Sequence, residues 1–553
     1  MTKKIIIVGG VAGGATAAAR LRRLDEKSEI IMFERGEYVS FANCGLPYYI
    51  GGTINKREKL LVQTVEGMSK KYNLDIRNLT EVVKINRDNK TVEVRNLSTG
   101  EQYEESYDVL LLSPGAKPIV PPIPGINDAE HLFTLRNVPD TDRIKKYVTE
   151  EKPQSAVVVG GGFIGLEMVE NLVELGIEVT LVEMANQVLA PIDFEMAAIV
   201  HDKLKAHGVN LILEDGVKAF EDRGKKVILN SGTEVITDMI ILSIGVRPEN
   251  ELARDAGLPL GNRGGILVNE FLQTDDPSIF AVGDAIEVVD YVSQAPAMIP
   301  LAGPANRQAR IVADNIYGRG KKYHGTLGTA VVKVFEYTIA ATGNNEKTLK
   351  QQGIDYRVVH IHPGSHAGYY PGANPIHFKL LFSPENGKVF GAQAVGVTGV
   401  EKRIDVIATA IKGELDVYDL TDLELSYAPP FSSAKDPVNM AGYVASNMLE
   451  DSIKTVQWDE IDSVVADGGV LIDVREPSEL KGGYIEGSIN IPLGDLRGRL
   501  DELPKGESIY INCQVGLRGY LATRILLENG YDAINLDGGW KTYSVAKGLV
   551  SNK

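Results

Sequence analysis

Apolar and polar positions near the start of the chain follow a strand, turn, helix, strand pattern. The apolar run of residues 5–8 leads into a glycine-rich segment, residues 9–14, and then into residues 15–24, which have helical spacing. A second apolar run, residues 29–33, ends in the acidic Glu34. This order predicts the β-α-β unit of a dinucleotide-binding fold.

The same pattern recurs further along the chain. Residues 156–159 form an apolar run, residues 160–165 a glycine turn, and a helical stretch continues to Leu175. The strand pattern of residues 178–182 then ends in Glu183. One glycine motif alone is weak evidence, but two copies that each end in an acid are strong evidence for two nucleotide-binding modules.

Each copy also has a related later strand. Residues 108–115 resemble residues 238–245, since both run from an aspartate through apolar residues and a serine to a glycine. The first copy departs from the usual fingerprint, because Val11 stands at its middle glycine position. The second copy keeps all three glycines of the fingerprint.

The pattern changes after these two modules. Short alternating runs at residues 330–335, 356–361, 377–382 and 389–395 predict strands, and a helical stretch follows at residues 401–411. This combination predicts an α+β domain.

The last part of the chain has the pattern of a separate α/β unit. A polar stretch near residues 450–454 predicts a linker. Beyond it, residues 470–473 and 508–512 predict buried strands, and residues 519–528 predict a helix.

Length and composition narrow the class of protein. The 553 residues exceed what one hydrophobic core supports, and 44% hydrophobic with 24% charged residues is typical of soluble globular proteins. A net charge of −16 argues against nucleic acid or an anionic membrane as a partner. No apolar run approaches the roughly 20 residues of a membrane span. The N-terminal apolar run is too short for a signal-peptide core, so we expect a cytoplasmic protein.

Only two cysteines occur, Cys44 and Cys513, and both lie in glycine-bounded loops. No CxxC or Cys/His cluster offers metal ligands, so we predict no metal site. Because the first loop holds a single cysteine, Cys44 has no local partner for an internal disulfide. Its thiol therefore has to cycle through a mixed disulfide, a persulfide or a sulfenate formed with something external.

Residues 274–284 resemble the second flavin-binding motif of two-dinucleotide-binding flavoproteins. The resemblance implies FAD in the first module and a nicotinamide coenzyme in the second. An acid at the end of the second strand, Glu183, favours NADH, with NADPH tolerated. The predicted cofactor-binding residues are Gly9, Gly14, Glu34, Arg35, Ser113, Gly115 and Asp284 for FAD, and Gly160, Gly162, Gly165 and Glu183 for the coenzyme.

The loop at residues 40–52, together with residues 10–14, closely resembles the coenzyme A-disulfide reductases. Residues 366–372 and 426–437 match further motifs of that family. The resemblance implies a homodimer in which Tyr369 and Tyr427 of the other subunit donate protons to the leaving CoA thiolate. Whether Tyr369 or its neighbour Tyr370 faces the flavin stays open at this point.

Coenzyme A carries phosphates, so its groove needs fixed positive charge in an otherwise acidic protein. Arg20 and Arg23 lie three residues apart on the first predicted helix and face one side. The family resemblance adds further candidates, and the predicted substrate-binding residues are Thr16, Arg20, Arg23, Ser40, Asn43, Lys71, Asn306 and Lys435.

Residues 472–476, 487–492 and 513–519 match a rhodanese domain in order and spacing. The last segment joins a strand to a helix, so its backbone N–H groups can surround the sulfur of Cys513. The resemblance implies that Cys513 accepts sulfane sulfur, with Arg518 nearby. The loop has the short length of a rhodanese, whereas a phosphatase relative would have a longer one, so phosphatase action and arsenate reduction are less favoured activities.

The predicted protein is therefore α/β, with two Rossmann-like dinucleotide-binding domains, an α+β dimerisation domain and a C-terminal α/β rhodanese domain. The predicted boundaries are residues 1–118 and 247–325 for the FAD domain, 119–246 for the NAD(P)H domain, 326–448 for dimerisation, 449–456 for a linker and 457–553 for the rhodanese domain.

The predicted function is reduction of CoA disulfide, CoA persulfide or polysulfide by NAD(P)H, coupled to sulfane-sulfur transfer. Two alternatives remain: an NADH oxidase or peroxidase that cycles Cys44 through sulfenic acid, and a redox sensor or sulfur-trafficking protein without fast turnover. The residues do not rank the three sulfur substrates.

Overall fold

The computed structural model describes residues 2–450 and 453–549. It divides into two compact units. The first comprises the chain up to Ala185 together with Val209–Gly328. The second comprises Asn186–Gly208 and the chain from Thr329 onward.

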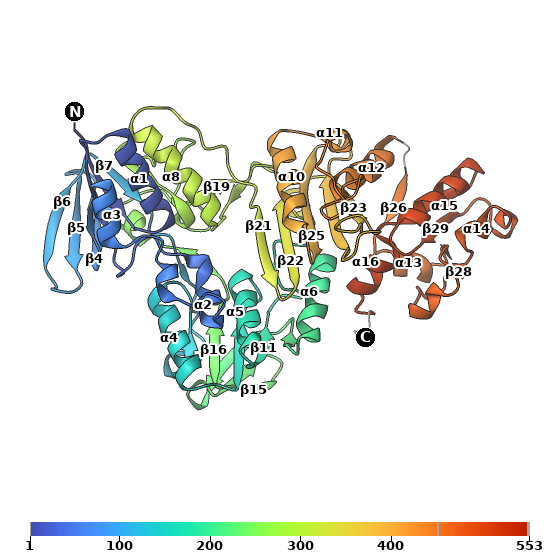
Figure 1. Cartoon of the computed structure of the whole chain (residues 1–553), viewed down its shortest axis with the longest axis horizontal. Helices are drawn as coiled ribbons and strands as arrows, with labels where there is room; N and C mark the ends of the chain where they lie inside the picture. Colours follow the sequence, from blue (N-terminus) through green and yellow to red (C-terminus); the bar gives the residue numbers. More distant parts are fainter. Residues whose placement is uncertain (1, 451–452, 550–553) are drawn as a thin grey trace. The chain divides into compact units, whose positions relative to one another are not determined.

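The FAD half of the first unit is built on a parallel sheet that gathers strands from distant parts of the chain (Figure 1). The strand order is β18 (Ile279–Ala281), β7 (Val109–Leu112), β1 (Lys4–Val8), β2 (Glu29–Phe33) and β3 (Asp75–Arg77). The helices of this half are α1 (Ala12–Leu24), α2 (Leu46–Gly51), α3 (Val65–Tyr72), α7 (Glu251–Asp255) and α8 (Ala302–Ile316).

Helix α1 begins three residues earlier than its apolar spacing predicts. Gly14 lies inside the helix, and a Cβ there would lie 1.8 Å from the carbonyl oxygen of Gly9. The glycine therefore lets the helix approach the end of β1 closely, which is the structural role of the third fingerprint glycine.

The coenzyme half of the first unit is built on a second parallel sheet, which resembles the sheet of the FAD half. Its strand order is β12 (Asn210–Ile212), β11 (Glu178–Val182), β10 (Ser155–Val159), β16 (Met239–Leu242) and β9 (Leu132–Phe133). Its helices are α4 (Val138–Glu150) and α5 (Phe163–Glu174). The two predicted nucleotide-binding modules are thereby confirmed as Rossmann-like sheets.

Small antiparallel sheets complete the first unit. They are β4 (Thr80–Asn86), β5 (Thr91–Asn96) and β6 (Gln102–Ser106); β13 (Val217–Glu221), β14 (Lys226–Leu229) and β15 (Glu234–Ile236); β19 (Val288–Val289) and β20 (Pro296–Ala297); and β8 (Ala116–Pro118) with β17 (Val246–Pro248). The chain passes from the FAD half to the coenzyme half at β8 and returns at β17. Both strands lie next to the predicted domain boundaries.

In the second unit, an antiparallel sheet forms the predicted α+β domain. Its order is β21 (Ala330–Val334), β22 (Tyr337–Gly343), β25 (Val389–Gly396), β24 (Ile376–Phe382) and β23 (Arg357–Ile361). Its helices are α9 (Glu346–Gln352), α10 (Val400–Lys412), α11 (Val417–Asp422) and α12 (Pro437–Glu450), with α10 packed on β22 and β25 (Figure 1).

Helix α6 (Phe194–Ala206) differs from the predicted division of the chain. The prediction placed it in the coenzyme domain, but it packs on β25 as part of the second unit. Side chains at its start are buried against this sheet, as the bond from Gln393 to Asp193 shows (2.6 Å). The periodicity of a helix does not indicate which domain the helix packs against, so the sequence could not predict this placement.

The C-terminal domain has the parallel sheet β26 (Lys454–Val456), β30 (Asp532–Leu536), β29 (Ser508–Asn512), β27 (Val470–Asp473) and β28 (Ile489–Asn490). Its helices are α13 (Ile461–Ala466), α14 (Leu493–Leu496), α15 (Leu517–Glu528) and α16 (Gly539–Ala546).

The predicted linker at residues 449–456 is largely replaced by regular structure. Glu450 ends α12, and Lys454–Val456 is a strand that pairs with β30. Residues 451–452 of the predicted linker lie outside the described residues. Polar composition suggested a linker here, whereas pairing with a strand some eighty residues later decides the conformation.

Candidate functional site

A pocket of about 760 Å³ opens at the carboxyl ends of the strands in the FAD half. Such a position, outside the strand ends of an open parallel sheet, is where doubly wound folds bind ligands. The predicted FAD residues that line it are Gly9, Glu34, Arg35, Ser113, Gly115 and Asp284, together with Asn43 of the cysteine loop.

The residues of this pocket fit an ADP-containing cofactor. Gly9 has φ 97°, and a Cβ there would lie 2.1 Å from the Ser113 carbonyl oxygen, so only glycine allows this turn. The Glu34 carboxylate accepts hydrogen bonds from the backbone N–H groups of Gly10 (2.8 Å) and Gly36 (2.7 Å). These bonds hold the acid where a ribose diol would meet it.

A charged cluster on the pocket wall joins Arg35 to two residues that the sequence analysis missed. Both Arg35 and Arg136 contact Glu249, each at 2.5 Å. Glu249 is buried, so its charge is compensated by two cations. The three residues come from separate parts of the chain, and no local pattern could have linked them.

Asp284 contributes a buried carboxyl group to the same pocket. Burial raises its pKa to about 6, against an opposing effect of the Arg136 charge. A carboxyl group in this state accepts hydrogen bonds readily from hydroxyl donors near neutral pH.

The coenzyme half repeats the arrangement of its FAD counterpart. Glu183 accepts hydrogen bonds from the N–H groups of Gly161 (2.7 Å) and Ala185 (2.8 Å). A Cβ at Gly160 would lie 2.5 Å from the Ser243 carbonyl oxygen, whereas one at Gly162 would meet no atom within 4 Å. Gly162 therefore borders open space at the start of α5, where a pyrophosphate would bind.

Cys44 lies in a short 3₁₀ turn, Asn43–Gly45, directly before α2. Helix α2 packs on α4 and α5 of the coenzyme half, and Gly51 makes this possible, since a Cβ there would lie 1.9 Å from Oδ1 of Asn171. The cysteine is thus held between the two nucleotide-binding halves of its unit.

The surroundings of Cys44 favour its thiol form. The side chain is exposed, yet neighbouring protein atoms partly desolvate the sulfur. This desolvation, followed by the negative charges of Glu167 and Asp284, raises the pKa of Cys44 above its ordinary value.

Glu167, on α5, is a third residue that the sequence analysis missed. It accepts a hydrogen bond from the Tyr48 hydroxyl at 3.3 Å. Burial and the nearby Glu170 raise the pKa of Glu167 to about 7, although the Tyr48 bond opposes this. Its protonation state therefore changes near neutral pH within reach of Cys44.

The predicted CoA-binding residues of the first unit lie mainly along α1 and α8. Oγ1 of Thr16 contacts Oδ1 of Asn306 at 2.5 Å. Arg20 pairs with Asp314 at 2.7 Å, so its charge is already compensated, whereas the side chain of Arg23 is exposed.

The other predicted CoA-binding residues are spread more widely. Ser40 has φ 47° and donates its backbone N–H to Gly10. Lys71 lies in the last turn of α3 with its Nζ over the Tyr72 ring (5.3 Å), Asn43 borders Cys44, and Lys435 is exposed in the second unit.

The structure distinguishes Tyr369 from Tyr370 by their contacts. The hydroxyl groups of Tyr369 and Tyr427 are 2.6 Å apart. Tyr370 instead packs edge-on against the His366 ring. The Tyr369 side chain is 77% exposed, which leaves the tyrosine pair on the surface of its unit.

Cys513 occupies a different kind of site. It is buried at the end of β29, and the Gly516 N–H points to its sulfur (3.1 Å) where α15 begins. This N–H belongs to the loop that the rhodanese motif predicts to surround the sulfur. Arg518, the other predicted residue, forms a two-fold ion pair with Glu479 (2.7 Å for each bond).

The Arg518 bond lowers the pKa of Glu479 to about 2. Behind the loop, Arg475 and Asp473 form a fully buried pair at 2.7 Å, and Arg475 also faces the Trp540 ring (5.1 Å). The sequence analysis quoted Asp473 and Arg475 within a motif but assigned them no role.

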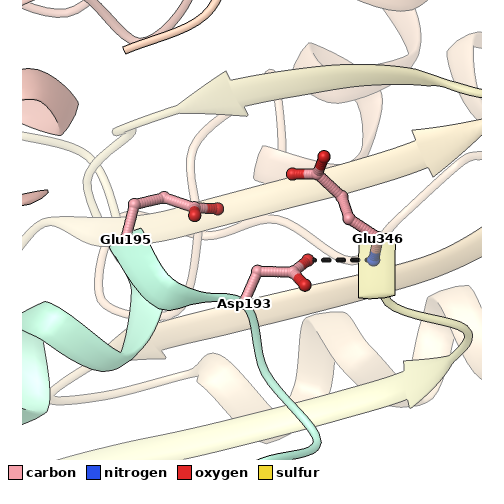
Figure 2. Close-up of side chains that lie close together, drawn as sticks. All are labelled: Asp193, Glu195 and Glu346. Carbon is pink, nitrogen blue, oxygen red and sulfur yellow. Dashed lines mark hydrogen bonds between the residues drawn. The ribbon is translucent and has the colours of Figure 1, made fainter. Parts of the chain in front are cut away.

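Three buried or half-buried carboxylates of the second unit, Asp193, Glu195 and Glu346, converge as Figure 2 shows. Such a group could hold a metal ion. Here Nζ of Lys379 lies 2.9, 2.5 and 2.5 Å from them, respectively. The lysine supplies the compensating cation, so the group is an ion-pair cluster.

Within residues 2–450 and 453–549, no helix is both long and apolar enough to span a membrane.

Comparison with known proteins matches every part of this architecture. The model of the pyridine nucleotide-disulphide oxidoreductases matches residues 3–309, that of their dimerisation domain residues 329–437, and that of the rhodanese-like domain residues 457–546. The predicted fold class, with its dimerisation and rhodanese domains, is confirmed by these three matches.

Individual relatives agree with this result. Reduced Bacillus anthracis CoADR-RHD is 64% identical, covers 100% of this chain and 99% of its own, and superposes with a TM-score of 0.98. The NAD-dependent persulfide reductase from A. fulgidus is 37% identical, covers 98% and 100%, and has a TM-score of 0.91.

The coenzyme A disulfide reductase of Staphylococcus haemolyticus is 39% identical over 451 residues, which are 81% of this chain and 100% of that protein. The chain therefore belongs to the pyridine nucleotide-disulphide oxidoreductase family, with a dimerisation domain and a C-terminal rhodanese-like domain.

Proposed function

We propose that this protein uses NAD(P)H to reduce CoA disulfide or CoA persulfide through Cys44, and that Cys513 carries sulfane sulfur. One observation carries the proposal: Cys44 is the single cysteine of its unit, and it lies beside a nucleotide-sized pocket. Its sulfur partner in the catalytic cycle must therefore come from a substrate.

Membership of the family implies FAD and a pyridine nucleotide. In our proposal Glu34, Asp284 and the glycine turn at Gly9 hold FAD, and Glu183 with the turn at Gly160 holds the coenzyme. When bound, FAD accepts hydride and makes an electron pair available at the cysteine. Glu183 accepts hydrogen bonds, so it suits the ribose 2′-hydroxyl of NADH better than a 2′-phosphate.

The thiolate of Cys44 performs the sulfur chemistry. It attacks one sulfur of the substrate, the S–S bond breaks, and a Cys44–CoA mixed disulfide forms while CoA thiolate or hydrosulfide leaves. Overall, CoA disulfide, NAD(P)H and a proton give two CoA thiols and NAD(P)⁺. CoA persulfide, NAD(P)H and a proton give CoA, hydrogen sulfide and NAD(P)⁺.

The tyrosine pair supplies a proton donor for the leaving thiolate. A phenol keeps its proton at neutral pH, and the hydrogen bond to Tyr427 raises the pKa of Tyr369 further. Both hydroxyls lie on an exposed surface of the second unit. We propose a homodimer in which this pair completes the Cys44 site of the other subunit.

The relative from A. fulgidus, a persulfide reductase, favours a persulfide as the substrate. The matches to CoADR-RHD and to the persulfide reductase cover 100% and 98% of this chain and so include the rhodanese-like domain, whereas the match to the disulfide reductase covers 81%. A rhodanese loop handles sulfane sulfur, so its presence suits a substrate that carries one. We propose that Cys513 exchanges this sulfur with CoA.

The CoA groove is proposed along Thr16, Arg23 and Asn306, with Ser40, Asn43 and Lys71 near its cysteine end and Lys435 from the partner. Since Arg20 is already paired with Asp314, the exposed Arg23 is the better phosphate ligand. Arg23→Glu should raise the KM for CoA substrates and leave that for small polysulfides unchanged. Equal changes in both would refute the groove.

A substrate panel tests the function. Wild type, Cys44→Ser and Cys513→Ser holoenzymes are supplied with NADH and with CoA disulfide, CoA persulfide, polysulfide, peroxide or oxygen. We expect fast NADH loss with CoA substrates, which Cys44→Ser abolishes, and hydrogen sulfide release from CoA persulfide. Faster turnover with oxygen or peroxide would instead establish the sulfenic acid cycle, and slow turnover throughout would indicate a sensor.

A further inference from the structure

The rhodanese-like domain is joined to the dimerisation domain by a chain of buried charges. Nε2 of His360, on β23, lies 3.0 Å from Oε1 of Glu195, and Nδ1 lies 2.7 Å from Oδ2 of Asp537. His360 also donates its backbone N–H to both carboxylate oxygens of Asp537, at 3.1 and 3.0 Å. His360 and Asp537 are 3% and 4% exposed, so neither charge has solvent to replace its partner.

This chain continues to the Lys379 cluster, because the Glu195 oxygen that meets His360 also meets Lys379 at 2.5 Å. Burial alone would lower the pKa of His360, but Asp537 and Glu195 raise it to about 9. The imidazolium is therefore the charged group that anchors Asp537 at neutral pH.

Asp537 stands at the start of the segment that holds the Cys513 loop. Two residues further on, α16 begins, and Trp540 donates its N–H to the Cys513 carbonyl oxygen at 2.7 Å. Lys541 donates likewise to Gln514 at 3.0 Å. The first turn of α16 thus fixes the backbone on which the reactive sulfur is carried.

Two consecutive glycines transmit the contact. Gly538 has φ 67°, and a Cβ there would lie 2.8 Å from Cβ of His360. Gly539 has φ 59°, and a Cβ there would lie 2.4 Å from the Cys513 carbonyl oxygen. Gly538 thus packs closely against His360 of the dimerisation domain, and Gly539 packs closely against the Cys513 loop. Because Asp537 directly precedes both glycines, a shift of Asp537 would move both contacts.

We propose that His360 and Asp537 are positioning residues of the sulfur-transfer site, and that the dimerisation domain sets the geometry of the Cys513 loop through them. This deepens the proposed function and rests on its assignment of Cys513 as the sulfur carrier. The rhodanese-like domain is then one half of a site whose other half is the sheet of the dimerisation domain.

The test compares holoenzymes of wild type, Asp537→Asn and His360→Gln with a matched control, Phe194→Leu. Phe194 stacks on Trp458 (centroids 5.8 Å apart) in the same domain contact, and both residues lie outside the 537–541 segment. Sulfur transfer is measured from glutathione persulfide to cyanide, as thiocyanate above an enzyme-free blank. NADH-dependent reduction of CoA disulfide and the melting temperature are measured on the same samples.

We expect Asp537→Asn to lower kcat for sulfur transfer about tenfold or more, because small misplacements of a reacting atom are that costly. The KM for the persulfide and the reduction of CoA disulfide should stay unchanged. Phe194→Leu should keep wild-type sulfur transfer even where its melting temperature falls. Equal losses of transfer in the control and in Asp537→Asn would overturn the proposal.

Hydrogen exchange decides the question independently of turnover. Amides of residues 513–519 should exchange several-fold faster in Asp537→Asn and His360→Gln than in wild type or Phe194→Leu. Unchanged exchange there would overturn the inference even if wild type transfers sulfur. A wild type that transfers no sulfur would refute the assigned role of Cys513, whereas the exchange result would still report on the loop.

Discussion

The two cysteines of this protein are held by opposite means. Cys44 is exposed in a 3₁₀ turn, where partial desolvation of the sulfur, followed by the negative charges of Glu167 and Asp284, raises the pKa of its thiol. Cys513 is buried at the start of the segment that carries Arg518, and the Gly516 N–H points to its sulfur. The first site disfavours negative charge on its sulfur, whereas the second places a fixed backbone donor against its sulfur.

This difference separates two kinds of sulfur chemistry in one chain. A redox thiol that reacts only with its substrate present avoids unproductive oxidation. A sulfur carrier has to keep a persulfide between two encounters, so it needs burial and fixed donors. Four predictions test this contrast, from the largest expected effect to the smallest.

The largest effect should come from removing either sulfur alone. Cys44→Ser should lower NADH-dependent reduction by about a thousandfold or more, since no nucleophile remains, yet leave persulfide-to-cyanide transfer intact. Cys513→Ser should do the reverse. The two rates are measured on the same preparations, and a variant that abolishes both would show that the sites do not act separately.

Arg518→Ala should lower sulfur transfer by about tenfold, because the cradle loses its fixed cation. The control is Arg524→Ala on the same helix, where Arg524 pairs with the exposed Glu528 at 3.2 Å. Thiocyanate formation is the readout. If Arg518→Ala and Arg524→Ala lower thiocyanate formation equally, Arg518 does not account for the difference between the Cys44 and Cys513 sites.

Glu167→Gln should speed the alkylation of Cys44 by iodoacetamide several-fold at pH 8, because removal of the carboxylate lowers the thiol pKa. The pKa of Glu167 is about 7, so this carboxyl group is charged above that pH and neutral below it. The difference between variant and wild type should therefore fade as pH falls through 7. Alkylation is followed in Cys513→Ser protein, and a difference that persists at pH 5 would contradict the electrostatic cause.

Glu479→Gln should have the smallest effect. Half-exposed ion pairs contribute about 0.5 kcal/mol to stability. Since the folded pKa of Glu479 is lowered to about 2, its contribution is complete above the ordinary value and is lost as pH falls toward 2. The stability difference in denaturant unfolding should thus be constant at pH 6–8 and shrink in acid. A loss of several kcal/mol would mean that Glu479 supports the Cys513 loop itself.

Local sequence patterns predicted the strands and helices well where burial and periodicity agree. The strand of residues 29–33 was predicted at its observed bounds, and the helix of residues 401–411 extends by one residue at each end. The exchange of α6 into the second unit and the strand Lys454–Val456 were not predicted, because each depends on a partner far along the chain.

The amino-acid sequence by itself determined the two nucleotide-binding turns, the single redox cysteine and the sulfur-carrying loop. In each case the chemistry depends on residues that are close in the chain, such as Glu34 and Gly10, 24 residues apart. Only the tertiary structure decided the Glu249 cluster, the pKa of Glu167 and the bond between His360 and Asp537, which are 177 residues apart. The physical reason is that turns and cradles arise from local backbone geometry, whereas desolvation and buried charge pairing depend on which distant segments the fold brings together.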